Sequence, residues 1–289
     1  MGAFSIKFIT FYTDLLYISN ESFPCTCDFI LLTYTYKQKG VYMNIRRTFA
    51  NIVSCFVPNK KLRGKTRVVL RYPETKDYIR WVRKWANEND GGVQKMSIAF
   101  GVGCKNLIVI LNDKNVFKFS LVNDGHDAAM REMRITDAFQ KITPIPMPKM
   151  EIIQWRGITI RRQEFFSGKL IGDFEPSYIL SKRTHIAKQL ANFLHVVGSS
   201  DPASIRDLKP KKTEKPGYLY GWFHNDIGQN FMMDDDLNIT GFIDWENTEF
   251  CDFKPTLYAA ERHWDKHGYR GLMVDVMAEY SKLYHENKK

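Results

Sequence analysis

Four polar residues within the stretch Trp222–Glu246 have types and spacing that suit phosphate chemistry. They are His224, Asp226, Asn230 and Asp244. Mg²⁺ is a hard cation that prefers oxygen ligands, and it typically binds one or two carboxylates together with substrate phosphates. The stretch therefore predicts a site that gathers carboxylates around a phosphate-bound Mg²⁺.

Short apolar runs flank an acidic turn in the same stretch. Phe231–Met233 precedes Asp234–Asp236, and Ile239–Ile243 follows it. Two apolar runs on either side of such a turn predict a β-hairpin. The loop before the hairpin and the residue after it would then present Asp226 and Asp244 side by side.

The pattern His224-x-Asp226, Asn230 and Ile243-Asp244-Trp245-Glu246 resembles that of the aminoglycoside phosphotransferase and choline kinase family. The resemblance implies an α+β protein with the two-lobed protein-kinase-like fold, a small antiparallel-sheet N-lobe and a mainly helical C-lobe. It also implies that Asp226 orients or deprotonates the acceptor hydroxyl, while Asp244 and Asn230 hold Mg²⁺ on the nucleotide phosphates. The turn is one residue shorter than the family's, because Asn230 follows Asp226 by four positions.

Three strands are predicted upstream, over Met96–Phe100, Leu107–Leu111 and Val116–Phe119. A turn with Gly101 and Gly103 joins the first two strands, and small turns let backbone N–H groups approach phosphates. Lys118 stands between two Phe residues, so its side chain points away from the covered face, into a cleft or into solvent. The same order of elements occurs in the family's N-lobe, and the resemblance implies that Lys118 binds the phosphates.

A helix is predicted over 126–141, and its Arg131-Glu132 pair matches a pair in the family. The resemblance makes Glu132 the partner of Lys118. The alternative is that Glu132 is a surface charge on the helix.

Two further strands are predicted over Glu151–Trp155 and Gly157–Glu164. The following sequence stands where the family's hinge holds the adenine base with main-chain groups. The resemblance therefore places Glu164 and Phe166 at the nucleotide base. This assignment depends on order along the chain, because main-chain contacts need no special side chains.

The C-terminal part predicts helices over 177–197, 255–267 and 269–285, with a loop-like region over 198–217. That loop is short for the helical acceptor subdomain of the large family members. It therefore argues against an aminoglycoside as the acceptor.

The net charge of +10 comes from one segment. Lys37–Arg71 contains ten Lys or Arg and no Asp or Glu, so the rest of the chain is neutral. A neutral body argues against a nucleic-acid-binding protein. Residues 44–71 combine basic clusters with apolar residues at helical spacing, which suits a helix on an anionic membrane surface. A helix packed on the body with a solvated basic face is the alternative.

The chain is expected to divide into a doubtful N-terminal extension (1–42), a basic amphipathic helical segment (43–92), an N-lobe with the hinge (93–168) and a C-lobe with the catalytic loop and metal site (169–289). The first part is rich in aromatic residues and Thr and has few charges. One interpretation is that the native protein starts at Met43. The other is that the extension forms an extra strand or a disordered arm.

The five cysteines are scattered, and Cys25-x-Cys27 has no second pair at zinc-binding spacing, so free thiols in a reducing cytosol are expected. The sequence contains no apolar run near the roughly 20 residues that span a bilayer. It also lacks a signal-peptide pattern at its N-terminus. A cytoplasmic protein is expected, with peripheral contact at the inner membrane face if segment 44–71 binds lipid.

Together these features predict an enzyme, an ATP- or GTP-dependent kinase that uses Mg²⁺ and phosphorylates a hydroxyl of a small molecule or cell-envelope sugar. A choline/ethanolamine kinase or an aminoglycoside kinase are alternatives. A quaternary ammonium acceptor needs an aromatic cage, which Trp222, Phe223 and Trp245 could supply. A catalytically inactive pseudokinase or membrane-associated adaptor is a further alternative, favoured by the shortened turn.

Overall fold

A computed structural model describes residues 37–38, 41–42, 50, 52–59, 62–63, 66–67, 70, 72, 74–100, 106–121, 125–210 and 220–286. The chain forms two compact units, Met1–Arg71 and Tyr72–Lys289. The four-part division expected from the sequence stays a prediction. Most of the extension 1–42 lies outside the described residues, as do the turn glycines Gly101 and Gly103.

The first unit contains a short hairpin and helical turns. Strand β1 (Lys37–Gln38) pairs antiparallel with β2 (Val41–Tyr42). Helical residues follow at 52–55, and Arg67 Nε donates a hydrogen bond to Ser54 Oγ at 3.2 Å. Within the described residues of the whole chain, none of the helices has the length and apolarity needed to cross a bilayer.

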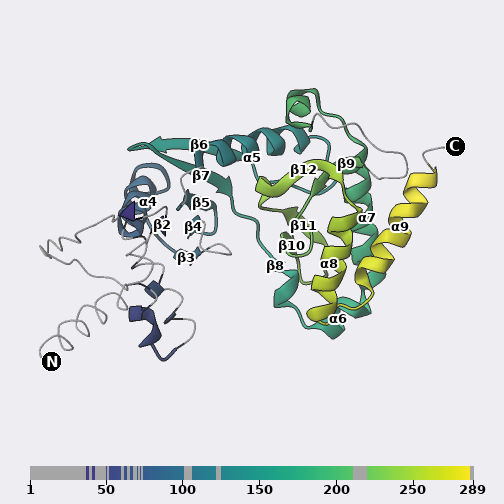
Figure 1. The fold of residues 1–289 in the computed structure, drawn as a ribbon, viewed down its shortest axis with the longest axis horizontal. Helices are drawn as coiled ribbons and strands as arrows, with labels where there is room; N and C mark the ends of the chain where they lie inside the picture. The colour runs from purple at the N-terminus through teal and green to yellow at the C-terminus, as the bar shows by residue number, and fades with distance from the viewer. Residues whose placement is uncertain are drawn as a thin grey trace, which may run out of the picture. The chain divides into compact units, whose positions relative to one another are not determined.

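The first part of the second unit contains an antiparallel sheet of five strands, in the order β3-β4-β5-β7-β6 (Figure 1). Its strands are β3 (Met96–Phe100), β4 (Asn106–Leu111), β5 (Asn115–Ser120), β6 (Met150–Trp155) and β7 (Ile158–Glu164). Alternate residues of β4 are buried, as the two-residue period of a strand requires. Leu111 pairs with Asn115, so the β4–β5 loop has three residues, of which Asn112 and Asp113 have φ 54° and 50°. Asn and Asp tolerate this left-handed region better than most residues.

Helix α4 (Thr75–Asn89) packs on one face of this sheet. Tyr78 stacks on Phe119 with 4.8 Å between ring centroids, and Trp85 meets the edge of Phe117 at 5.0 Å. Because Phe117 and Phe119 point toward α4, the intervening Lys118 points to the opposite face. Helix α5 (Gly125–Phe139) supplies the partner that Lys118 meets on that face.

The second part of the unit is mainly helical. Its helices are α6 (Pro176–Ser181), α7 (Arg183–Ser199), α8 (Lys254–Lys266) and α9 (Leu272–Glu286). The single helix predicted over 177–197 is two helices, because Lys182 leaves helical geometry at φ −117° and ψ 23°. Phe193 of α7 stacks on Phe242 at 4.0 Å in the larger of the two hydrophobic cores.

Two small antiparallel sheets lie among these helices (Figure 1). Their strands are β8 (Lys169–Leu170), β9 (Tyr220–His224), β10 (Phe231–Met233), β11 (Ile239–Phe242) and β12 (Thr248–Asp252). The β10–β11 pair is the predicted hairpin, and β8 adds to its β10 edge. Strands β9 and β12 form a second pair, which brings Thr248 opposite His224 and was not predicted.

Candidate active site

Lys118 lies at the centre of an ion cluster. Its side chain is buried, with Nζ 2.6 Å from Asp244 Oδ1 and 3.5 Å from Glu132 Oε1. Burial alone would lower the pKa of Lys118, but the two carboxylates outweigh it and raise that pKa. The strand alternation thus brings together the Lys and Glu that the sequence predicts as partners.

Asp244 follows β11 and adopts a left-handed backbone conformation, with φ 64° and ψ 58°. Asp tolerates this region better than most residues, and here it turns the chain sharply into the short 3-10 helix η4 (Trp245–Asn247). Burial by itself would raise the pKa of Asp244, but the Lys118 ammonium holds it below its usual value. The side chain remains 40% exposed, so its second oxygen is accessible.

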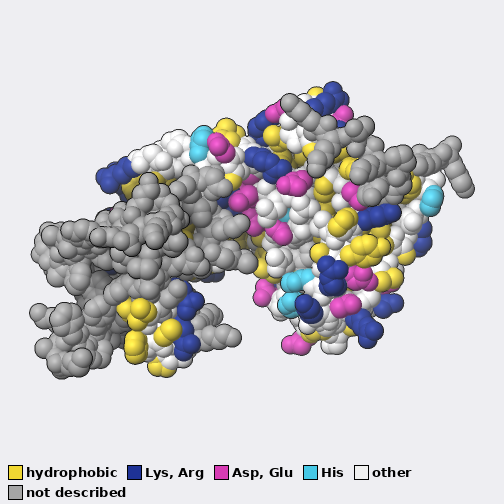
Figure 2. All heavy atoms as spheres, viewed as in Figure 1, with side chains coloured by type: hydrophobic (Ala, Val, Ile, Leu, Met, Phe, Trp, Pro, Cys, Tyr) yellow, Lys and Arg dark blue, Asp and Glu magenta, His cyan; other side chains and the backbone are white. Residues whose placement is uncertain are grey.

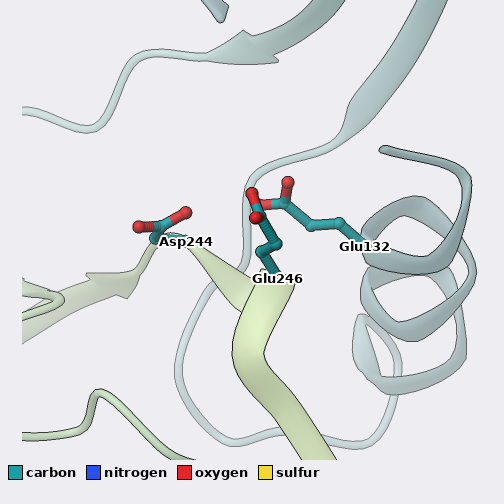
Figure 3. Close-up of side chains that lie close together, drawn as sticks. All are labelled: Glu132, Asp244 and Glu246. Atoms are coloured by element: carbon teal, nitrogen blue, oxygen red, sulfur yellow. The ribbon is translucent and has the colours of Figure 1, made fainter. Parts of the chain in front are cut away.

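Three carboxylates meet at this position. Ligand atoms of Glu132, Asp244 and Glu246 all lie within 4.8 Å of one another (Figure 3). Arg161 pairs with two of them, because its Nη1 is 2.7 Å from Glu132 Oε2 and 2.7 Å from Glu246 Oε2. Asp244 is the carboxylate that these contacts do not engage, and its partly exposed side chain pairs with Lys118 through Oδ1. Its second oxygen is therefore the one that could bind a metal ion.

Arg161 and Glu246 were not predicted as site residues. In β7, Arg161 stands directly opposite Lys118 of β5. Its neighbour Ile160 belongs to the core beneath α4, so the two-residue period puts Arg161 on the Lys118 face. That alternation was readable from the sequence, but the register that pairs Arg161 with Lys118 was not.

A second arginine, Arg131 of α5, is hydrogen-bonded to the backbone of the segment after Asp244. Arg131 Nη1 donates to the carbonyl oxygen of Glu246 at 2.7 Å, and Nη2 donates to that of Thr248. The predicted Arg131-Glu132 pair thus contacts both sides of the site. Glu132 meets the Lys, and Arg131 meets the backbone beyond the metal ligand.

Asp226 lies in the turn after β9 and is oriented by two neighbours. Its Oδ2 accepts a hydrogen bond from Asn247 Nδ2 at 2.7 Å. Its N–H donates to His224 Nδ1 at 3.3 Å, while His224 Nε2 donates to the carbonyl of Ile243 at 3.0 Å. Only a neutral imidazole protonated at Nε2 satisfies both bonds, and burial accordingly lowers the pKa of His224. His224 therefore supports the turn, and Asn247 is a contact that was not predicted.

Helix α8 anchors the same turn from the other side. Trp264 Nε1 donates to the Gly228 carbonyl at 2.6 Å, and Thr256 Oγ1 donates to Asn225 Oδ1 at 3.2 Å. A Cβ added at Gly228 would lie 3.4 Å from the Trp264 ring nitrogen. The turn is thus held in place although it is one residue shorter than the family's.

Asn230 is the last residue of the turn, and its backbone is joined to the residue before Asp244, the candidate metal ligand. Its carbonyl accepts a hydrogen bond from the Ile243 N–H at 2.9 Å, so the residues next to Asn230 and Asp244 are joined. Within the described residues, the Asn230 side chain has no hydrogen-bond partner. The accessible carboxylate oxygen of Asp244 and the side-chain amide oxygen of Asn230 are ligand types that fit Mg²⁺.

The hinge residues lie between the two parts of the unit. Glu164 is exposed at the end of β7, and the Phe166 ring packs where a Cβ at Gly241 would be 2.5 Å away. Gly168 has φ 125°, and a Cβ there would lie 2.5 Å from the Met233 carbonyl. The backbone at position 168 therefore requires glycine.

The aromatic residues proposed for a cation cage are in the core. Trp222, Phe223 and Trp245 are all buried, and Trp222 and Trp245 each contact Phe139 with ring centroids 6.0 Å apart. A ligand cation could not reach their faces. The expectation that they could form an aromatic cage was wrong, because Trp222 and Phe223 lie on the buried strand β9 and Trp245 is buried in η4.

Solved structures with a similar fold include aminoglycoside and macrolide phosphotransferases. One is the GDP and kanamycin complex of APH(2")-IIIa, which is 15% identical with a TM-score of 0.58 over 70% of this chain and 83% of that one. Another is the streptomycin–ATP complex of APH(2")-IIa, 10% identical with a TM-score of 0.55 over 69% and 80%. A third is the macrolide 2'-phosphotransferase MphH from Brachybacterium faecium, 10% identical with a TM-score of 0.51 over 70% and 82%.

At these identities the likeness establishes the fold. The chain has the two-lobed protein-kinase-like fold of the aminoglycoside phosphotransferases, and the predicted fold is confirmed. No protein-family model and no curated protein sequence matches the chain.

Proposed function

We propose that the protein is a phosphotransferase that moves the γ-phosphoryl group of ATP or GTP to a hydroxyl of a small molecule or cell-envelope sugar. The observation that carries the proposal is the convergence of Lys118, Glu132 and Asp244 in one cluster, with Asp226 tied to the following segment by Asn247. Phosphoryl transfer needs a cation for the phosphates, a carboxylate for the metal and a carboxylate for the acceptor. The similarity to nucleotide-bound phosphotransferases supports the same conclusion.

Asp226 orients the acceptor hydroxyl and accepts its proton late in the reaction. Asn247 occupies Oδ2, which leaves Oδ1 for the acceptor. Lys118 neutralises phosphate charge and is held by Glu132. For this, Lys118 must exchange Asp244 for a phosphate oxygen when nucleotide binds.

Asp244 and Asn230 are the residues that would hold Mg²⁺. When bound, Mg²⁺ supplies charge neutralisation to the transferring phosphoryl group. Gly101 and Gly103 would approach the phosphates, and Glu164 and Phe166 would flank the nucleotide base. Similar structures hold GDP or ATP, so both guanine and adenine nucleotides are candidates.

A cell-envelope sugar is our first choice of acceptor, because the basic first unit would keep the enzyme near anionic lipid. An aminoglycoside is the second choice, since structures of the same fold bind kanamycin and streptomycin. Choline is no longer favoured as an acceptor, because the buried side chains of Trp222, Phe223 and Trp245 cannot form a cage around its ammonium group.

The test combines calorimetric nucleotide binding with and without Mg²⁺ and a phosphate-transfer assay over sugars, aminoglycosides and choline. We expect Asp226→Asn to reduce turnover by about 10²–10⁴ while nucleotide affinity is unchanged. Asp236→Asn, at an exposed aspartate of the β10–β11 turn, is the matched control. A wild-type protein that binds nucleotide but phosphorylates nothing would favour the pseudokinase alternative, and one that binds none would exclude the kinase.

We also propose that the protein is cytoplasmic and that it contacts anionic membrane through residues 44–71. Ile52 and Phe56 are one helical turn apart, and they are 57% and 82% exposed. At the lower left of Figure 2, hydrophobic side chains (yellow) of the described residues in the first unit lie beside Lys and Arg (dark blue). An exposed apolar pair in a segment without acidic residues suits the interface of an anionic bilayer.

Liposome flotation tests this contact. We expect binding to vesicles that contain phosphatidylglycerol, none to phosphatidylcholine alone, and clear loss of binding in Phe56→Ser. Val274→Ser changes a residue that is 56% exposed on α9 and serves as the matched control. Equal flotation of wild type with both lipids, or no flotation at all, would remove the membrane proposal.

A further inference from the structure

One buried guanidinium joins three elements around the proposed phosphate site. Arg161 Nη2 donates to Asn106 Oδ1 of β4 at 2.7 Å. Its Nη1 contacts Glu132 of α5 and Glu246 of η4, each at 2.7 Å. We propose that Arg161 is a positioning residue that sets the nucleotide-phosphate site by fixing these three partners relative to Lys118 and Asp244. The inference rests on the proposed function and names a residue that the function alone does not require.

Each partner stands next to a group that would meet the nucleotide. Asn106 begins β4, and Ile108 of that strand pairs with Lys118 of β5. Glu132 is the partner of Lys118, and Glu246 is two residues beyond Asp244. A shift of Arg161 would therefore move the start of β4, the partner of Lys118 and the turn that carries Asp244 together.

Arg161 also decides how Glu132 is oriented. Glu132 gives Oε2 to Arg161, which leaves Oε1 facing Lys118 and Gln163, each at 3.5 Å. The shorter contact is the one to Arg161, so it governs the carboxylate's rotation. Without it, Glu132 could give both oxygens to Lys118 and draw it away from the phosphates.

The geometry of the site requires arginine. A guanidinium has several N–H donors in a fixed plane and can serve three acceptors from one position, whereas a lysine ammonium on a flexible chain acts as a point charge. Burial of the charge is tolerated because two carboxylates and an amide oxygen surround it. Lysine at this position would keep the charge and lose the simultaneous contacts.

The neighbouring Arg162 provides a matched control on the opposite face of β7. Its guanidinium lies 4.9 Å from the Trp85 ring centroid, and it pairs with Glu151 at 2.6 Å and Asn115 at 2.9 Å. These contacts belong to the α4 side and the sheet edge. Arg162→Lys should lower thermal stability slightly without changing nucleotide binding.

The experiment measures the Kd of Mg²⁺-ATP and Mg²⁺-GTP for wild type, Arg161→Lys and Arg162→Lys, with the melting temperature of each. We expect Arg161→Lys to weaken nucleotide binding at least about tenfold, equivalent to about 1.4 kcal/mol, with Arg162→Lys equal to wild type. Glu246→Gln changes one partner of Arg161 and keeps the other two, and we expect it to weaken nucleotide binding several-fold. This variant supplies the test if Arg161→Lys does not fold.

A purely structural role would lower melting temperature and leave the Kd of the folded protein unchanged. Unchanged Kd in Arg161→Lys, or in Glu246→Gln if the first variant does not fold, would overturn the inference while the proposed function stands. A wild-type protein that binds neither nucleotide would overturn both.

Discussion

The hydrogen bond between Asn247 and Asp226 allows a graded perturbation of the proposed base. Asn247→Ala removes the Nδ2 donor that lies 2.7 Å from Asp226 Oδ2, and Asn247→Asp replaces it with a carboxylate at the same position. Asn247 is exposed, so neither change should impair folding. The first variant frees the Asp226 carboxylate to rotate, and the second repels it.

The expected losses differ in size. A hydrogen bond to a charged group contributes about 1.5–3 kcal/mol, but water can replace the donor at this exposed position, so we expect about 1 kcal/mol. That corresponds to about a fivefold lower kcat/KM in Asn247→Ala. Two like charges about 4 Å apart repel by about 1 kcal/mol in water and about 4 kcal/mol near a protein surface. We take about 2 kcal/mol, or about a thirtyfold loss, for Asn247→Asp.

The assay is acceptor kcat/KM at saturating nucleotide, measured at low and high salt. The Asn247→Asp loss should shrink at high salt because the repulsion is screened, whereas the Asn247→Ala loss should not. Asn89→Ala is the control, since Asn89 is an exposed residue of α4 whose Nδ2 bonds the Trp85 carbonyl at 3.0 Å. If both Asn247 variants match wild type, or the Asp variant is as active as the Ala variant, Asn247 does not orient the base.

Three further changes test the packing and charge of the same unit. Glu132→Gln should lower the free energy of unfolding by about 3 kcal/mol, which is the low end for breaking a buried ion pair, because Lys118 keeps Asp244 and Arg161 keeps Glu246. The melting temperature should fall by about 6–12 °C, and an unchanged melting temperature would contradict the buried cluster. Stability should decline as pH falls below about 6.5, since the unfolded His224 imidazole binds a proton that the folded one resists. Urea denaturation should show a flatter pH profile over that range in His224→Gln, and an equally steep profile would assign the decline to other groups. Phe193→Ala removes a ring stacked on Phe242 at 4.0 Å, and it should lower the free energy of unfolding, measured by urea denaturation, by about 3–5 kcal/mol. A decrease below about 1 kcal/mol would be incompatible with a packed core.

Local patterns and the family resemblance together predicted the central residues of the site. The strand pattern around Lys118 left its side chain facing a cleft or solvent, and the hairpin placed Asp244 beside Asp226. The resemblance assigned Lys118 to the phosphates and Glu132 as its partner. The structure brings all three into one cluster. Their roles in catalysis stay predictions until the variants are measured.

The residues that sequence reasoning missed depend on pairings between distant segments. Arg161 meets Lys118 only through the register of β5 and β7, and Glu246 meets Arg161 across a separation of 85 residues. Periodicity reports which face a residue occupies, but it does not report which residue of another strand lies opposite. The wrong expectation for Trp222 and Trp245 has the same origin, since exposure depends on what packs above a strand.

The segment Asp244–Asn247 makes contacts in three directions within one turn. Asp244 meets Lys118, Glu246 meets Arg161 and Asn247 meets Asp226, while Trp245 is buried beneath them with its Nε1 bonded to the Phe242 carbonyl. A single-residue insertion or deletion here would misdirect the metal ligand, the ion cluster and the base at the same time. By contrast, an insertion in the turn Asp234–Asn238 would disturb core packing, because Leu237 is buried and its carbonyl accepts a hydrogen bond from Gln189 Nε2 at 3.2 Å.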